Sequence, residues 1–302
     1  MNDRRLRIFE EVAVHLSMSA VARRMFLSQP AVSQAIHELE GELGTKLFDR
    51  IGRKLYLTEA GKAFLPYARK TLNTYDEGLK AIGEIDGAAA GTLSVGASTT
   101  VGIYVLPQII GWFLESHPRV DVALAIENTR IIEERVLYNA LDFAFVEGPV
   151  ESGEIVVEEF CGDELVFIIP PRHPWAATGR VELESLGREK FILREQGSGT
   201  RDVFERAMRQ LKADYRVAFE LGNTEAIKKA VEAGMGVSCI SGRCVTREVE
   251  LGKLATARLT QMDIKRSFNL IYHRDKYLSA LFKTFIGFAR EEIHSPRNHP
   301  PL

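Results

Sequence analysis

The stretch from Met18 to Leu57 constrains the fold of this chain more than any other. It reads as a short helix, a tight turn, a second amphipathic helix and a basic hairpin. Apolar residues of the second helix recur at three- and four-residue steps, which places them on one buried face. Ser28 can cap this helix, and Pro30 suits its first turn because the amide that proline lacks has no intrahelical partner there. The pattern is typical of a helix-turn-helix, with an ordinary helical hairpin as the alternative.

The basic hairpin favours the helix-turn-helix. Its glycine-containing turn is surrounded by three cations, Arg50, Arg53 and Lys54. Such a wing can follow a phosphate backbone or enter a minor groove, where basic side chains meet strong negative potential. Residues 1–70 carry a net charge of +4, whereas the remainder carries −6. A basic end on an acidic body suits contact with a polyanion, so we expect double-stranded DNA as a partner.

The packing of this first domain can also be predicted. We expect Ser19 to cap the short helix, and Phe26 and Leu27 to fill the turn. Leu47 and Phe48 are predicted to lie in the core rather than to contact bases.

A long helix is predicted from Thr58 to about Ile85, with Pro66 near its start. Its apolar residues lie three or four positions apart, which is the spacing of a coiled-coil seam. The seam consists of Phe64, Ala68, Leu72, Tyr75, Leu79 and Ile82. The helix should therefore form a homodimer through residues 58–85; the alternative is a helix packed on its own domain.

After a small joint at residues 87–91, strand and helix patterns alternate, which indicates an α/β domain with parallel strands. Strands are predicted near 92–97, 120–126, 143–146, 156–160, 165–169, 191–193, 216–220, 237–240 and 267–272. Helices are predicted near 106–116, 131–139, 201–211, 225–233 and 279–293, and the tail 295–302 is expected to fray. This order resembles a two-lobed, periplasmic-binding-protein-like (type II) domain in which the chain crosses between lobes near Cys161 and Arg266.

The predicted organisation has three parts. A DNA-binding domain spans residues 1–58, a dimerising linker helix spans 59–88, and a two-lobed effector-binding domain spans 89–302. Within the last, lobe I comprises about 92–161 and 267–293, and lobe II about 162–266.

Three polar turns, at residues 98–100, 197–200 and 222–224, each follow a predicted strand and precede a helix. Ligands of open α/β sheets bind at the carboxyl ends of strands, and helix starts offer free amides to small anions. The alternative is that these residues are ordinary helix caps. The candidate effector-binding residues are Ser98, Thr99, Thr100, Glu147, Arg194, Gly197, Ser198, Thr200, Asn223 and Thr224.

Two of these candidates carry opposite charges. Arg194 could bind an oxyanion in a bidentate manner. Glu147 would oppose an anion unless a cation neutralises it, and an amine-bearing ligand would use it better.

The segment SAVARRMFLSQPAVSQAIHELEGELGTKLFDR, followed by GRKLYLTEAG, resembles the N-terminal domain of LysR-type transcriptional regulators without a gap. The resemblance implies a winged helix-turn-helix, a dimerising linker helix, a homotetramer, contact with RNA polymerase, and ligand-responsive control of metabolic genes. The residues that it assigns to DNA binding are Ser28, Gln29, Pro30, Ser33, Gln34, His37, Arg50, Arg53 and Lys54.

Three further segments, ILREQGSGTR, ELGNTEAIKKAVEAGMGVSCIS and YHRDKYLSALFKTF, resemble the branch of this family associated with sulfur assimilation and sulfite reduction. This resemblance implies sulfite, sulfate or a related sulfur metabolite as effector. An unrelated amino- or carboxylate metabolite is the alternative.

Catalytic and membrane classes are not indicated. The sequence contains no GxSxG, no phosphate-binding loop with its lysine and no HExxH, and its seven histidines are scattered, so we expect neither an enzyme, nor a cofactor, nor a metal. Cys161, Cys239 and Cys244 are read as reduced thiols, the last two as core and surface residues. Charges near the N-terminus argue against a signal peptide, and a cytoplasmic location is expected.

A solute receptor or an enzyme built on the two-lobed domain is the remaining rival. Either would leave the N-terminal domain without a purpose. The salt dependence of DNA binding distinguishes a regulator from these rivals. A duplex binder loses affinity steeply as ionic strength rises, whereas a receptor should barely bind duplex at all.

Overall fold

The computed structural model describes residues 2–52, 54–85 and 91–294. They form two compact units, the first comprising the residues up to 85 together with Tyr138–Ala140 and the second the rest of residues 91–294. The joint residues 87–90, the wing residue Arg53 and the tail 295–302 lie outside the described residues.

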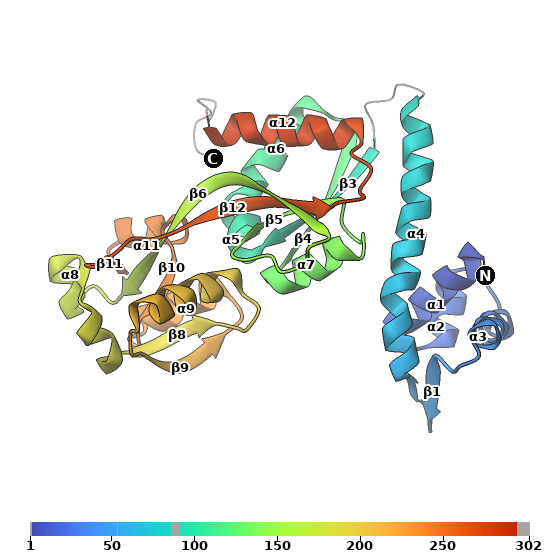
Figure 1. Ribbon diagram of the computed structural model, residues 1–302, viewed down its shortest axis with the longest axis horizontal. Helices are drawn as coiled ribbons and strands as arrows, with labels where there is room; N and C mark the ends of the chain where they lie inside the picture. The colour runs from blue at the N-terminus through green and yellow to red at the C-terminus, as the bar shows by residue number, and fades with distance from the viewer. Residues whose placement is uncertain (1, 53, 86–90, 295–302) are drawn as a thin grey trace. The chain divides into compact units, whose positions relative to one another are not determined.

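The N-terminal unit is a winged helix-turn-helix followed by a long helix (Figure 1). Its elements are α1 (Asp3–His15), α2 (Met18–Arg24), α3 (Gln29–Leu43), β1 (Phe48–Ile51), β2 (Lys54–Leu57) and α4 (Glu59–Ile85). Ser28 caps α3 by accepting a hydrogen bond from the amide of Ala31 (3.3 Å), as predicted. Leu47 and Phe48 are buried in the core, which confirms that prediction.

Two local predictions in this unit are wrong. Ser17, not Ser19, caps α2, because the helix begins at Met18 and the Ser17 hydroxyl accepts from the amide of Ala20 at 3.2 Å. Phe26 does not fill the turn: it is 96% exposed and has a left-handed backbone with φ 55°. That conformation directs its ring away from the core, whereas Leu27 packs against the core as predicted.

The apolar stripe of α4 divides into two parts. Ala68 and Leu72 are buried and Phe64 is half-buried, all against the core of their own unit. Tyr75, Leu79 and Ile82 are exposed. The first half of the predicted seam is therefore occupied within the chain, because α1 packs against it, and the second half presents an apolar surface.

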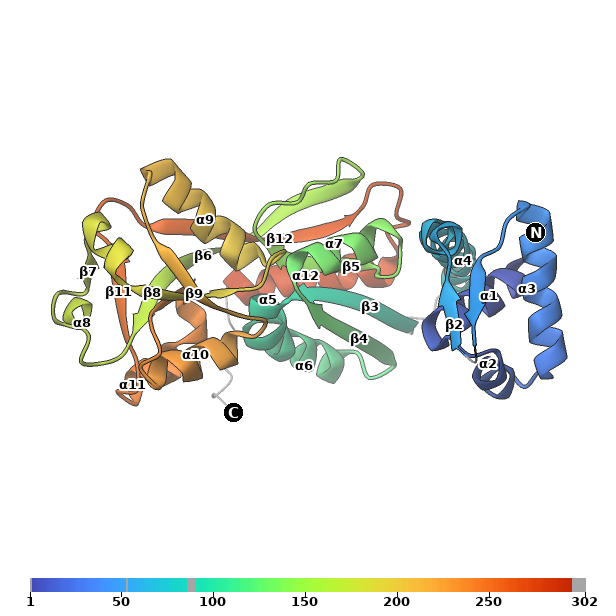
Figure 2. The same cartoon turned by 90° about the horizontal axis from the view of Figure 1, so that it is seen from below.

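The C-terminal unit is an α/β domain of two lobes joined by two long strands (Figures 1 and 2). The first lobe contains β3 (Gly91–Ser98), α5 (Thr99–Tyr104), α6 (Leu106–Ser116), β4 (Val120–Glu127), α7 (Thr129–Leu137), β5 (Phe143–Glu147) and α12 (Ala280–His294). The second contains α8 (Pro174–Thr178), β7 (Arg180–Val181), η1 (Leu183–Arg188), β8 (Lys190–Arg194), α9 (Gly199–Leu211), β9 (Arg216–Leu221), α10 (Thr224–Glu232), β10 (Ser238–Ser241), η2 (Gly242–Cys244), α11 (Thr246–Glu250) and β11 (Ala255–Leu259).

The connecting strands are β6 (Ile155–Ile169) and β12 (Ile264–His273), which pair antiparallel along the whole of β12. They belong to an eight-stranded sheet of order β4-β3-β5-β12-β6-β11-β7, in which β10 also pairs with β6, while β8 and β9 form a separate parallel pair. The prediction of two strands near 156–160 and 165–169 is wrong, because pairing with β12 carries β6 through Gly162 and Asp163 as one strand, with a register shift opposite Phe268 and Asn269.

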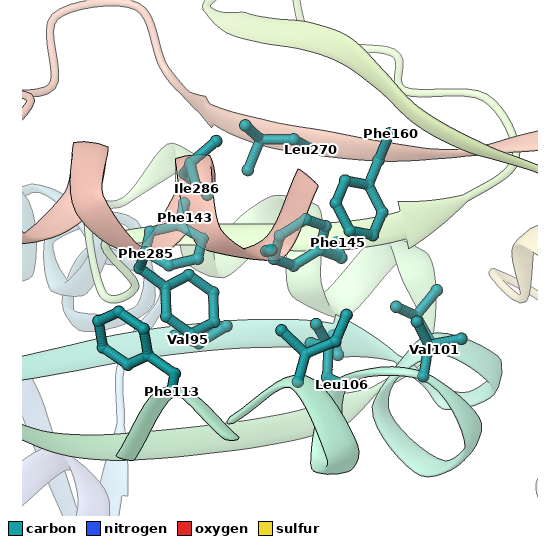
Figure 3. Close-up of a cluster of buried hydrophobic side chains, with 14 of the residues drawn as sticks. Val95, Val101, Leu106, Phe113, Phe143, Phe145, Phe160, Leu270, Phe285 and Ile286 are labelled. Carbon is teal, nitrogen blue, oxygen red and sulfur yellow. The ribbon is translucent and has the colours of Figure 1, made fainter. Parts of the chain in front are cut away.

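Each lobe has its own hydrophobic core. In the first lobe, Phe143 and Phe145 of β5 face α6 and α12, where they pack with residues such as Phe113 and Phe285 (Figure 3). The alternate residues of β5 pack beneath α7 on the other face of the sheet. The second lobe is built around Phe167, Phe191 and Phe204. Cys244, expected at the surface, is 2% exposed because η2 folds it against β6.

Candidate DNA-reading surface and interlobe polar cluster

The polar face of α3 and the basic hairpin form one concave surface in the N-terminal unit. It surrounds a cavity of about 420 Å³ lined by Gln29, Ser33 and His37 from α3 and by Arg50 and Lys54 from the hairpin. Ser33 is half-buried and the other four are exposed. Hydrogen-bonding groups beside cations suit base edges beside phosphates. The structure thus brings these five predicted residues to one surface.

The other predicted DNA-binding residues lie differently. Ser28 is used as a helix cap and Pro30 is exposed in the first turn of α3. Gln34 donates to Glu38 at 2.9 Å, and Glu38 also pairs with Arg5 at 2.6 Å. The Gln34 side chain is therefore held toward α1.

Four polar side chains that the sequence patterns did not assign to DNA binding also line this cavity: Ser17, Ser19, Glu40 and Lys46. Lys46 is held by Glu40, a buried carboxylate of α3 that accepts from its ammonium group at 2.8 Å. The same carboxylate accepts from the amides of Leu47 and Phe48 at 2.9 and 3.3 Å. Glu40 thereby fixes the start of the hairpin against α3.

In the C-terminal unit, several predicted effector residues meet where the two lobes face each other. We call the set Ser98, Thr99, Glu147, Arg194, Thr200 and Thr224 the interlobe cluster; all six residues are buried. Arg194, from the second lobe, donates to Thr99 of the first lobe at 3.0 Å and to Thr224 at 3.3 Å. Glu195 accepts from the same guanidinium at 2.8 and 2.9 Å. Burial acts to raise the pKa of Glu195, but its bonds to Arg194 outweigh burial and hold that pKa below its ordinary value.

Glu147 is the second charged member of the cluster and is 1% exposed. Its carboxylate accepts hydrogen bonds from Ser98 in its own lobe and, at 3.3 Å, from Thr200 in the other lobe. Among the residues that the structure describes, no Lys or Arg lies within ion-pair distance of this carboxylate. Arg266 reaches it indirectly, because its Nη1 donates to the Thr200 hydroxyl at 2.9 Å.

The backbones of the two lobes also approach closely beside Glu147. A Cβ atom on Gly199 would lie 1.8 Å from the Glu147 carbonyl oxygen, so only glycine fits there. The Thr129 hydroxyl bridges the approach, donating to that carbonyl at 2.9 Å and accepting from the Gly199 amide at 3.3 Å.

The remaining predicted residues differ in their roles. Asn223 is exposed, and its side chain caps α10 by accepting from the amides of Glu225 and Ala226. The carbonyl of Gly197 accepts from the Arg130 amide. The hydroxyls of Thr100 and Ser198 are in buried residues, yet within the described part of the chain they make no hydrogen bond.

Arg266, Asp163, Thr129 and Glu195 were not selected from the sequence. Arg266 and Asp163 form a buried ion pair (2.7 Å) across β12 and β6, more than a hundred residues apart in the chain. No local pattern indicates such a pair.

No group of three or more His, Cys, Asp or Glu side chains within residues 2–52, 54–85 and 91–294 is placed to hold a metal ion. In the same ranges, no helix is long and apolar enough to cross a membrane.

A winged helix-turn-helix with a polar, basic reading surface, followed by a two-lobed domain with a polar cluster between the lobes, defines a ligand-responsive transcriptional regulator. The chain belongs to the LysR family of these regulators. Residues 4–62 match the family model of the bacterial regulatory helix-turn-helix protein, lysR family, and residues 86–293 match the LysR substrate binding domain. The protein is therefore a DNA-binding transcriptional regulator and not an enzyme.

Individual relatives agree with this assignment. The uncharacterized HTH-type transcriptional regulator YeiE of Escherichia coli (strain K12) is 36% identical over 285 residues, covering 94% of this chain and 96% of that protein. The Synechocystis PCC6803 CcmR regulatory domain, solved in complex with 2-PG, is 31% identical with a TM-score of 0.63 and covers 70% of this chain and 100% of that chain. Full-length CbnR, solved with its target DNA, is similar in fold, with a TM-score of 0.70 at 23% identity over 96% of this chain and 99% of that chain.

Proposed function

We propose that two copies of the chain pair through the exposed half of α4 and place their α3 helices in major grooves of a roughly palindromic site. Gln29, Ser33 and His37 read base edges, and Arg50 and Lys54 contact phosphates. The observation that carries this proposal is the shared concave surface of α3 and the hairpin. The structure of CbnR with its target DNA supports it by analogy of fold.

Equilibrium DNA binding tests these roles. Gln29→Ala and Ser33→Ala should each weaken binding to the target by about 1–3 kcal/mol and relax base preference, because each removes a base contact. Lys54→Gln should weaken binding to target and random duplexes alike and reduce the salt dependence. Equal losses on target and random duplexes for Gln29→Ala would contradict base reading.

We infer that the effector binds at the interlobe cluster and uses the unpaired hydroxyls of Thr100 and Ser198. A ligand there would contact both lobes, so it would stabilise one relative lobe orientation through its differential affinity for the two states. Binding of 2-PG by the CcmR regulatory domain supports a small polar ligand in this domain.

Glu147 restricts the chemistry of the effector. An ionised carboxylate only accepts hydrogen bonds, so a ligand that touches it should present an N–H or O–H donor. An amine-bearing metabolite meets this condition, and so does a protonated oxyanion. The names of the relatives reported above do not refer to sulfur, so they do not favour a sulfur oxyanion as the effector. Two effector classes are therefore to be compared, sulfur oxyanions and amine-bearing metabolites.

A thermal-shift screen of the full chain compares the two classes. Sulfite, sulfate and thiosulfate form one arm, and sulfur amino-acid precursors with their deaminated counterparts form the other. A true effector raises the unfolding temperature because stabilisation follows ligand saturation. The double variant Thr100→Ala, Ser198→Ala should lose this response while retaining DNA binding.

Ser116→Ala with Thr284→Ala is the matched control, since both hydroxyls are in exposed residues of α6 and α12. An unchanged ligand titration in the Thr100, Ser198 double variant would show that the effector binds elsewhere.

A further inference from the structure

A second cavity lies on the two strands that join the lobes. It is an open depression with a volume of about 830 Å³, lined by parts of β6, β12 and η2, including Asp163, Arg243, Lys265 and Arg266. We call it the hinge cavity. Its volume is in the range of sites that hold small metabolites.

Arg266 gives the hinge cavity a buried cation. Its side chain is 3% exposed, and its Nε donates to Asp163 at 2.7 Å. Its Nη1 donates to Thr200 of the interlobe cluster at 2.9 Å. The remaining nitrogen, Nη2, is buried and has no hydrogen-bond partner in the described part of the chain. Unsatisfied buried donors are rare in folded proteins, and a bound acceptor is one explanation for such a group.

Arg243 adds a second, more accessible cation. Its side chain is 45% exposed, its Nε lies 3.7 Å from Asp163, and its Nη2 donates to the carbonyl of Gly162 at 3.2 Å. Both guanidinium groups lie over the ring of Phe268, at 5.9 Å for Arg243 and 5.4 Å for Arg266. Two guanidiniums thus share one carboxylate.

The other carboxylates of the cavity have partners of their own. Glu164 pairs with Arg258 at 2.6 Å, and Glu159 accepts from the Ser267 hydroxyl at 2.7 Å. Glu164 is thus neutralised by a cation whereas Glu159 keeps its charge, and at Asp163 two guanidiniums, of Arg243 and Arg266, face one carboxylate.

We propose that the hinge cavity binds the oxyanion group of a small metabolite, held by the guanidiniums of Arg243 and Arg266. Planar guanidiniums suit bidentate recognition of phosphate, sulfate and carboxylate. Binding at this second site does not require that the effector binds at the interlobe cluster. Arg266 also donates to the Thr200 hydroxyl, which in turn donates to Glu147, so an anion that draws Arg266 toward the hinge would weaken the hydrogen bond from Arg266 to Thr200.

Isothermal titration of the full chain with inorganic phosphate, at ionic strength held constant with NaCl, tests the proposal. The wild type should show saturable binding with one hinge site per chain. Arg243→Gln should weaken this binding at least about tenfold, as expected for loss of a charge-assisted bond. Arg247→Gln is the matched control, because this exposed arginine of α11 does not line the cavity and should leave the affinity unchanged.

Three results would overturn the proposal. The first is no saturable binding of phosphate, sulfate or citrate. The second is equal phosphate affinity in the wild type and Arg243→Gln, which would indicate an adventitious ion only. The third is loss of phosphate binding in the Thr100→Ala, Ser198→Ala double variant but not in Arg243→Gln, which would assign the ion to the interlobe cluster. Failure at the hinge leaves the proposed effector site intact, because that site is judged by a different variant.

Discussion

Glu40 connects the recognition helix to the wing through three hydrogen bonds, two of them from the backbone of Leu47 and Phe48. Glu40→Gln should destabilise this connection by about 1.5–3 kcal/mol, since bonds to a charged acceptor are lost or weakened. Hydrogen exchange of the Leu47 and Phe48 amides should accelerate about tenfold or more. Glu59→Gln is the control, because its side chain is 90% exposed and, among the residues that the structure describes, pairs only with Lys62. Unchanged protection of both amides in Glu40→Gln would contradict this role.

The cysteines show a second property at the residue scale. Burial raises the pKa of Cys244 to about 12, and burial also raises the pKa of Cys161 and of Cys239. Because the thiolate is the reactive form, all three should be alkylated slowly by iodoacetamide at pH 8 in the folded protein and rapidly in urea. Mass spectrometry measures the difference. Rapid modification of folded Cys244 would show that η2 opens readily.

Single residues also show where sequence reasoning is sufficient. The Ser28 cap could be predicted because its proline and helix pattern are local. The role of Glu40 could not be predicted, because its hydrogen-bond partners lie beyond the loop that follows α3. Nothing in the sequence distinguishes Glu40 from an exposed helical glutamate. The unpaired Nη2 atom of Arg266 could not be predicted either, since its burial depends on the packing of strands that are distant in the sequence.

At the scale of elements, α4 carries two different surfaces. Leu79→Glu with Ile82→Glu should abolish self-association through this helix, because charges replace exposed apolar contacts. Light scattering should then report a smaller mass with the N-terminal unit still folded. Leu72→Glu should instead unfold that unit, because its side chain is 2% exposed in the core. An unaltered mass in the Leu79, Ile82 double variant would contradict the pairing.

Elements with strong periodicity were predicted well, and those defined by tertiary contacts were not. Helix α6 matches its predicted range of 106–116, since a full apolar face specifies it. The short helices α5, α8 and α11 are not predictable from the sequence, because five or six residues carry too little periodicity. Strand β6 was divided in two because Gly162 and Asp163 are typical of a turn, whereas pairing with β12 overrides that local preference.

At the scale of the whole molecule, the chain combines a DNA-binding winged helix-turn-helix with a two-lobed LysR substrate binding domain. The order of strands and helices predicted both parts, because hydrophobic patterning determines the fold class. The interlobe cluster could not be predicted in full, since it joins hydroxyls with Glu147 and Arg194 from segments of two lobes that lie far apart in the sequence.

The most direct test of the central claim is selection of binding sites by the full chain from a pool of random duplexes. Wild-type protein should enrich an inverted repeat whose half-sites are separated by about one helical turn or a multiple of it. Gln29→Ala should relax the consensus at defined positions within each half-site, while the spacing of the half-sites is kept. An enriched sequence without twofold symmetry, or an identical consensus for Gln29→Ala, would contradict the paired, base-reading role of α3.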